Sequence, residues 1–520
     1  MLFSLALCIH ATVRAQEPRS YSPPEFDRAW SQPTNHPDRI VLNLGADPSS
    51  SASVTWRTST EIDTAYAEIA IATAAPKFWR NATTLMARTT RFDGSDIPTA
   101  ETVAHYHAAV FTGLKPNTTY AYRVGDGKRW SEWIQFKTAD QAGSESRYSF
   151  LYVGDAQNFI LELWSRLIRE GYKKAPDARF IIHAGDLVNR AHREQDWQEW
   201  FDAGGWIHSS LPSFPVPGNH EYSPLNEMER VSGIRSLSAQ WPHQFTLPEN
   251  GPEGLAETAY FMDYQNTRII GLNSNEQFEE QAQWLEEVLA ATTQKWKVVT
   301  FHHPLFSASG GRDNAYLRNL WKPLLDKYQV DLVLQGHDHS YARGRVSPGE
   351  NVLEGVNLRD KTGTVYVVSV SGGKMYGLRP EGWDGWEAER DRAAENTQLF
   401  QVITVEGDTL SFESYTAVGE LYDAFDLVKQ QKGPNRFVER KQEAIAPRRF
   451  DNTIPYHDEL PTGIEKMLLE RYPGFEIDKV TFVKREGHTA YAVELEKGEA
   501  EIELVVDLAG NILEEVVEED

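Results

Sequence analysis

Residues 330–343 read VDLVLQGHDHSYAR, and this stretch decides how the middle of the chain is interpreted. The run before Gly336 has the apolar character of a buried strand, and His337 and His339 follow it directly. Two interpretations fit the stretch alone. The histidines belong either to a polar turn or to a metal site, because imidazole nitrogen is the commonest protein ligand of transition metals. The ends of the other strands have to decide between them.

Four other apolar runs in the middle of the chain also end in polar groups. These groups are Asp155 and Gln157 after YSFLYVG, Asp186 after FIIHAG, Asn219 and His220 after FPVPG, and His302 after KVVTF. One such end indicates only a turn or a helix cap, but that explanation would have to hold at all five strand ends. Because the carboxyl ends of strands in an α/β sheet line one edge, where ligands bind, we expect these groups to meet there.

The chemical types of these side chains predict a metal centre. Carboxylate, amide oxygen and imidazole without any thiolate suit Zn, Mn or Fe. Seven of these groups exceed the needs of one ion, whereas two ions roughly 3.5 Å apart that share a carboxylate would use them all. The seven are Asp155, Gln157, Asp186, Asn219, His302, His337 and His339. His183 lies within its strand and is interpreted as a core residue, and His303 as a neighbour of the centre.

The 520 residues predict about two to four domains. Short alternating runs such as SASVTWRT predict a β-sandwich, in which FTGLKPNTTYAYRVG resembles fibronectin type III modules. Helical spacing in residues 158–174 and 279–294, between apolar runs, predicts an α/β domain. The predicted parts are a signal peptide (1–15), an extended arm (16–38), a fibronectin III-like domain (39–139), an α/β domain (145–430), a linker (431–459) and a small α+β module (460–520).

Charge and targeting signals narrow the possible partners. The net charge is −24, about half of it in residues 451–520, which argues against nucleic acid and anionic membrane surfaces as partners. The apolar start of the chain resembles a secretory signal and holds Cys8, the only cysteine. No later segment has ~18 consecutive apolar residues, so no transmembrane segment is expected. We expect a secreted or periplasmic protein.

The ordered pattern G-D, G-D, G-N-H-E, H-x-P and G-H-x-H resembles the calcineurin-like metallophosphoesterase superfamily. QAQWLEEVLA, HDHSYAR and TVYVVSVSGG resemble purple acid phosphatases, and the resemblance covers residues 39–427. It implies an α/β fold, the four-layer αββα metallophosphoesterase sandwich, with an N-terminal all-β sandwich and a small C-terminal α+β module. That module resembles PepSY-like domains of exported bacterial proteins, which implies a bacterial source.

The resemblance also implies a role for each site residue. Asp186 would bridge two metal ions; Asp155 and His339 would hold the first ion. The second ion would be held by Asn219, His302 and His337. His220, beside Asn219, would face the phosphate and protonate the leaving alkoxide.

The chain departs from purple acid phosphatases at Asn189 and in the segment after H-x-P, and it differs from other members of the superfamily at Gln157. Asn189 stands where they have the tyrosine whose charge transfer to ferric iron gives the colour. Gln157 stands where other members of the superfamily have a histidine ligand, so we expect it to be the fifth ligand of the first ion. The segment LFSASGGRDNAY lacks the further histidines that the family has after H-x-P. Without a tyrosinate, a divalent metal pair is expected rather than one with Fe(III).

Three functions remain open. The first is a secreted phosphatase that hydrolyses phosphate monoesters of small molecules by attack of a metal-bridging hydroxide. The second is a phosphodiesterase acting on nucleotides or lipid headgroups. The third is a surface binding protein without catalysis, against which the complete set of Asp186, Asn219, His220, His302 and the His337–His339 pair argues.

Overall fold

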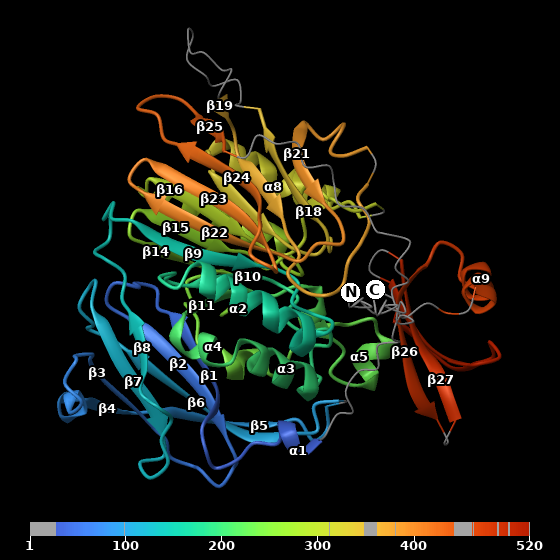
Figure 1. Cartoon of the computed structure of the whole chain (residues 1–520), viewed down its shortest axis with the longest axis horizontal. Helices are drawn as coiled ribbons and strands as arrows, with labels where there is room; N and C mark the ends of the chain where they lie inside the picture. The colour runs from blue at the N-terminus through green and yellow to red at the C-terminus, as the bar shows by residue number, and fades with distance from the viewer. Residues whose placement is uncertain are drawn as a thin grey trace, which may run out of the picture. The chain divides into compact units, whose positions relative to one another are not determined.

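The computed structural model of the chain describes residues 28–97, 99–310, 312–347, 361–379, 381–440, 460, 462–485, 488–497 and 500–518. These residues fall into two compact units, one within Asp27–Phe450 and one within Asp451–Asp520 (Figure 1). The predicted signal peptide and most of the predicted arm and linker lie outside the described residues. The two units are described separately.

Eight strands near the N-terminus form a two-sheet sandwich, as predicted. One sheet contains β1 (Asp38–Leu44), β2 (Ala52–Thr58), β6 (Val103–Phe111) and β5 (Arg88–Asp93), and the other β4 (Thr83–Met86), β3 (Tyr66–Ile71), β7 (Thr119–Gly125) and β8 (Ile134–Lys137). Trp56, Tyr122 and Phe136 lie in the core between them. The alternation pattern missed β4 and β5, because both are edge strands with mostly exposed side chains.

The first sheet of the sandwich continues into the α/β region. Strand β1 pairs in parallel with β11 through Asn43 and Ser213, so one twelve-stranded sheet runs through both regions. The α/β strands of this sheet are β9 (Tyr148–Val153), β10 (Ile181–Ala184), β11 (Ser213–Val216), β19 (Lys361–Thr362), β22 (Leu399–Glu406), β23 (Thr409–Thr416), β24 (Leu421–Val428) and β25 (Asn435–Glu439).

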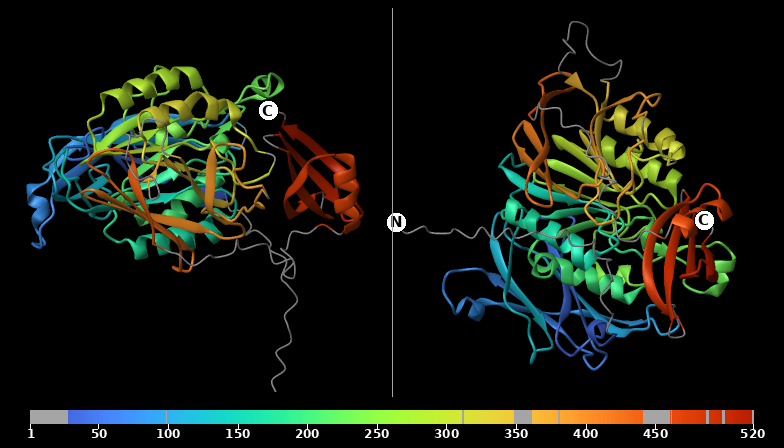
Figure 2. Two further views of the ribbon diagram at one scale, coloured as in Figure 1. Left: turned by 90° about the horizontal axis from the view of Figure 1, so that it is seen from above. Right: turned by 45° about the vertical axis from the view of Figure 1, so that its right-hand side comes forward.

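A second sheet of seven strands packs against this one. Its order is β14 (Tyr260–Tyr264), β15 (Thr267–Gly271), β16 (Trp296–Thr300), β17 (Leu332–Gln335), β20 (Val365–Val368), β18 (Tyr341–Val346) and β21 (Ala388–Ala394). The first sheet is covered by the π-helix η2 (Ile160–Trp164), α2 (Ser165–Lys174), α3 (Glu194–Gly204) and α4 (Trp206–Ser210), and the second by α7 (Phe278–Ala291) and α8 (Ala315–Lys327) (Figure 2). The predicted four-layer αββα order is confirmed.

The shorter elements connect these layers. They are α1 (Arg28–Ser31), η1 (Phe78–Asn81), η3 (Asn219–Glu221), β12 (Tyr222–Ser223), α5 (Glu227–Val231), β13 (Ser236–Leu237) and α6 (Trp241–Gln244). Within the described ranges, no helix has both the length and the apolar character that crossing a membrane requires.

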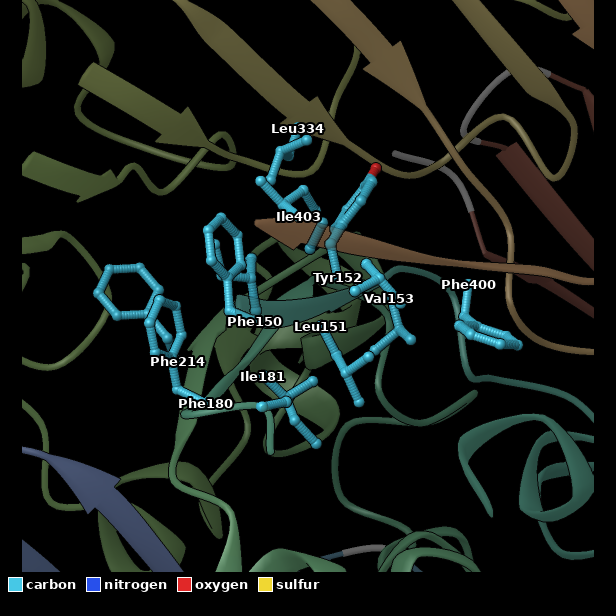
Figure 3. Close-up of a cluster of buried hydrophobic side chains, with 14 of the residues drawn as sticks. Phe150, Leu151, Tyr152, Val153, Phe180, Ile181, Phe214, Leu334, Phe400 and Ile403 are labelled. Atoms are coloured by element: carbon cyan, nitrogen blue, oxygen red, sulfur yellow. The ribbon is translucent and has the colours of Figure 1, made fainter. Parts of the chain in front are cut away.

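Buried side chains of alternating direction hold the two sheets together. Tyr152 and Ile403 point from the first sheet toward Leu334 of the second, whereas Leu151 and Ile181 point to the opposite, helix-covered face (Figure 3). The Tyr152 hydroxyl also donates a hydrogen bond across the interface to the Gln335 carbonyl. Strands buried on both faces explain why their sequences are continuous apolar runs.

The C-terminal unit is the predicted small α+β module. Helix α9 (Thr462–Arg471) precedes an antiparallel meander of β26 (Glu476–Arg485), β27 (His488–Lys497), β28 (Ala500–Asp507) and β29 (Ile512–Glu518). Leu468 of the helix packs on Val493 and Leu504 of the strands. The PepSY-like identity of this module stays a prediction.

A buried ionic cluster joins the sandwich to helix α3. Arg57 is 0% exposed and forms paired hydrogen bonds of 2.8 Å to Asp38, while its third nitrogen lies 2.6 Å from Glu194 of α3. Arg39 also lies 2.6 Å from Glu194. Removing one partner of a buried ion pair leaves the remaining charge uncompensated, which is strongly unfavourable.

Arg57→Ala should therefore lower the free energy of unfolding by about 3–5 kcal/mol. Urea unfolding followed by circular dichroism measures the change. Arg91→Ala is the matched control, because Arg91 pairs with Asp93 on the exposed surface of β5, and it should change stability by less than about 0.5 kcal/mol. Equal effects of the two substitutions would contradict a structural role for the buried cluster.

Candidate metal centre

The predicted site residues lie at the carboxyl ends of five strands that belong to two sheets. Strands β9, β10 and β11 run parallel in the twelve-stranded sheet, and β16 and β17 run parallel in the seven-stranded sheet. The residues that follow these strands are Asp155, Gln157, Asp186, Asn219, His220, His302, His337 and His339. The sequence predicted a single edge, and the structure shows two sheet edges that meet.

One group of donor atoms contains Asp186, His302 and His337, all buried and mutually within 4.8 Å. His302 Nε2 lies 3.0 Å from an Asp186 carboxylate oxygen and 3.0 Å from Asn219 Oδ1. His337 Nδ1 lies 3.1 Å from the same amide oxygen and 3.2 Å from His302 Nε2. Four side chains from four strand ends therefore converge on one small volume.

A second group contains Asp155, Asp186 and His339, again buried and within 4.8 Å of one another. Gln157 lies inside it, because its amide nitrogen is 3.2 Å from Asp186 Oδ2 and 2.9 Å from His339 Nε2. Asp186 is common to both groups. This is the arrangement expected for two ions that share one carboxylate.

The backbone at these residues adopts conformations that are uncommon for non-glycine residues. The φ angles of Asp155, Asp186, His337 and His339 are 52°, 51°, 75° and 48°. Such residues cost free energy and are concentrated at functional sites. Each of them turns the chain sharply at a strand end and aims its side chain into the centre.

Two glycines of the sequence motifs, Gly336 and Gly218, lie so close to site carboxylates that no side chain fits at their positions. A Cβ on Gly336 would lie 2.5 Å from an Asp155 carboxylate oxygen, and a Cβ on Gly218 would lie 2.1 Å from Asp186 Oδ1. Both distances are shorter than any real contact of a Cβ atom. The absence of a side chain at these positions lets the two carboxylates reach the centre.

Two buried carboxylates in the centre, Asp155 and Asp186, disfavour each other's ionisation. Burial, together with the charge of Asp186, raises the pKa of Asp155 well above its usual value. Burial also opposes ionisation of Asp186, but the charges of His302 and His220 outweigh it and lower the pKa of Asp186. Burial lowers the pKa of His302, but Asp186 reverses this and raises it to about 9. Added positive charge would stabilise both carboxylates.

The lone pairs in the centre fit a cation. His302 Nδ1 donates to the Ala184 carbonyl at 2.8 Å, so in the neutral ring the Nε2 lone pair faces the oxygens of Asp186 and Asn219. Asp155 Oδ2 and Gln157 Oε1 are buried and have no hydrogen-bond partner. Rotating the Gln157 amide would turn this oxygen toward Asp186 and His339. Buried acceptors that converge in this way are satisfied by a metal ion.

His220 borders the centre and is half-buried. Its backbone N–H donates to Asp186 Oδ1 at 2.9 Å, and its Nδ1 lies 2.7 Å from the Asn189 carbonyl oxygen. Because that carbonyl can only accept, Nδ1 carries a proton, and the neutral ring has its lone pair on Nε2. The backbone of Asn189 therefore orients His220.

The sequence did not predict a role for Glu221, which lies directly after the Gly-Asn-His motif. Its buried carboxylate accepts backbone N–H bonds from Asp186 and Leu187 at 2.8 Å and from Gly218 at 2.7 Å. Burial and the charge of Asp186 raise its pKa to about 8. Glu221 fixes the loop that carries Asp186, and only the fourth letter of G-N-H-E signalled it.

Two family models match this chain. Residues 37–138 match the purple acid phosphatase N-terminal domain, and residues 148–341 match calcineurin-like phosphoesterase. Together the two models span more than half of the chain.

Individual relatives agree with these matches. The Fe(3+)-Zn(2+) purple acid phosphatase 12 of Arabidopsis thaliana is 24% identical over 298 residues, which are 53% of this chain and 61% of the relative. The phosphoenolpyruvate phosphatase of Allium cepa is 25% identical over 382 residues, 68% of this chain and 74% of the relative. The chain thus spans about three fifths to three quarters of these relatives.

Among solved structures, a purple acid phosphatase from yellow lupin (Lupinus luteus) seeds has the same fold. The TM-score is 0.63 at 21% identity, over 76% of this chain and 75% of the lupin protein. The resemblance inferred from the sequence motifs is thereby confirmed. The chain contains a purple acid phosphatase N-terminal domain followed by a calcineurin-like phosphoesterase domain.

Proposed function

We propose that the protein is a metal-dependent phosphatase that hydrolyses phosphate monoesters of small molecules. The observation that carries the proposal is the pair of buried donor groups that share the Asp186 carboxylate. When bound there, two transition metal ions would neutralise phosphate oxygens and make a water molecule acidic enough to be the nucleophile.

In this proposal each donor group holds one ion. Asp155, Gln157 and His339 belong to the first ion, and Asn219, His302 and His337 to the second. Asp186 belongs to both, since it is a member of both groups. Carboxylates, imidazoles and amide oxygens without a tyrosinate or a thiolate favour divalent ions such as Mn or Zn over Fe(III).

His220 is proposed as the general acid. With Nδ1 held by the Asn189 carbonyl, Nε2 is the ring atom that would exchange a proton with the substrate. When Nε2 is protonated, it can transfer that proton to the oxygen of the leaving alcohol. Asn219, the residue before His220, is proposed to contact the phosphate as well.

The phosphodiesterase alternative uses the same centre and differs only in the substrate. Parallel assays of p-nitrophenyl phosphate and bis(p-nitrophenyl) phosphate, with Mn, Zn or Fe supplied, distinguish the two. Turnover of neither ester by the metal-loaded protein would favour the non-catalytic binding protein.

Asp186→Asn should abolish both metal occupancy and turnover, because it removes the charge that the two groups share. Elemental analysis of the purified protein should show two ions per wild-type chain. The proposal would be wrong if active wild-type protein contained only traces of transition metal.

His220→Ala should keep both ions and lose about 10²–10⁴ in kcat, the usual contribution of a general acid. The loss should be larger for esters with poor leaving groups, such as alkyl phosphates, because these depend on protonation. Full activity on an alkyl phosphate would show that another group donates the proton.

Gln157→Ala should weaken the first site alone, because Gln157 contacts only Asp186 and His339 among the donors. Metal titration followed by elemental analysis should then show one weakened and one unchanged site.

The wild-type protein should have no visible charge-transfer band, and Asn189→Tyr tests whether a tyrosine at that position raises iron affinity. A purple wild-type protein would refute this assignment.

A further inference from the structure

We propose that Arg312 binds the phosphate of the substrate and makes the site selective for phosphate monoesters over diesters. This inference rests on the phosphatase function proposed above and deepens it, because it names the residue that chooses the class of ester. Nothing in the sequence pattern singled out this arginine.

Arg312 lies in the segment between β16 and α8, where the chain lacks the expected histidines. Its Nη1 is 2.9 Å from His337 Nε2 and 3.0 Å from the His337 carbonyl oxygen. Its guanidinium lies over the Tyr376 ring at 4.8 Å, and that ring lies 4.9 Å from the His339 ring. Arg312 therefore borders both donor groups at once, and it is only half-buried.

A second cation, Lys374, lies on the same side. Lys374 Nζ is 5.4 Å from the Tyr376 ring, and its carbonyl accepts a hydrogen bond from His339 Nδ1 at 3.1 Å. Arg312 and Lys374 thus place two positively charged side chains beside Tyr376 on this side of the centre, and such charges attract an anionic substrate.

Metal binding changes what Arg312 can contact. A neutral imidazole has a single lone pair on nitrogen. His337 Nδ1 faces Asn219 and His302, the other donors proposed for the second ion. When His337 uses that lone pair for a cation, its Nε2 carries the proton and cannot accept from Arg312. The hydrogen bond from Arg312 Nη1 to His337 Nε2 is then lost, and the substrate phosphate can accept from Nη1 in its place.

The chemistry of a guanidinium explains the expected selectivity. Its planar fork donates two parallel hydrogen bonds to two oxygens of a phosphate. A monoester dianion offers three non-bridging oxygens and two negative charges, whereas a diester offers two oxygens and one charge. When two oxygens are engaged at the metal centre, a monoester still presents its third non-bridging oxygen to Arg312, and the second N–H of the fork can share one of the other two. A diester has an alkoxy group in place of that third oxygen.

The test compares wild type, Arg312→Gln and Arg312→Lys with the control Arg318→Gln. Arg318 lies in the first turn of α8, close to Arg312 in the chain. Its guanidinium contacts Asp313 at 2.6 Å and the Leu305 carbonyl at 2.8 Å. Each protein is loaded with metal and its metal content is measured. Calorimetry gives the affinity for orthophosphate, and kinetics give kcat/KM for the mono- and bis(p-nitrophenyl) esters.

Arg312→Gln should keep its metal and bind orthophosphate roughly 10- to 100-fold more weakly, the usual effect of losing a hydrogen bond between charged groups. Monoester kcat/KM should fall by a similar factor and diester kcat/KM by less than about threefold. Arg312→Lys should be intermediate, because a lysine keeps the charge but not the fork. Arg318→Gln should match wild type in phosphate affinity.

Unchanged orthophosphate affinity in Arg312→Gln would overturn the proposal. An equal loss on both esters, with reduced metal content, would show instead that Arg312 only positions the His337 loop. Failure of wild type to hydrolyse either ester would reject the proposed function, and the orthophosphate titration would still decide the role of Arg312.

Discussion

The buried charge of Asp186 is the constraint on which the rest of the structure depends. This side chain is 1% exposed, and its carboxylate contacts the backbone N–H of His220, the amide of Gln157 and the ring of His302. A carboxylate in such a position is stable only when positive charge and hydrogen-bond donors surround it. Asp155 adds a second buried carboxylate to the same volume, so bound cations would stabilise the ionised form of both groups.

The fold meets this demand by joining two sheets at their carboxyl edges. Neither sheet alone supplies both donor groups, since the aspartates follow β9 and β10 and the histidines follow β16 and β17. Side chains such as Tyr152 hold the sheets together, and Glu221 fixes the loop of Asp186. The left-handed backbone conformation of the donor residues is unfavourable in free energy, and the packing of the surrounding layers has to compensate for it. These contacts hold the backbone that carries the donors, and a preorganised arrangement of this kind favours catalysis.

The two sides of the centre have different tasks. The strand ends provide the buried donors, whereas the segments outside the strands provide His220, Arg312 and Lys374 at the half-buried border. Under the proposed function, the strand ends would hold the metal ions, and the border residues would select the ester. Loops on a rigid scaffold commonly carry specificity in this way.

The sequence by itself determined the fold class and identified the strand ends that carry the predicted donors, because apolar runs and the groups that end them are local features. The order of the layers followed from the resemblance to purple acid phosphatases. The sequence pattern also determined the α+β form of the C-terminal module. It missed the exposed edge strands β4 and β5, whose side chains carry no alternation. Only the tertiary structure decided that two sheets build the centre, that Glu221 anchors it and that Arg312 reaches His337. The physical reason is that such contacts join residues far apart in the chain, and no local pattern encodes which distant side chains will share a volume.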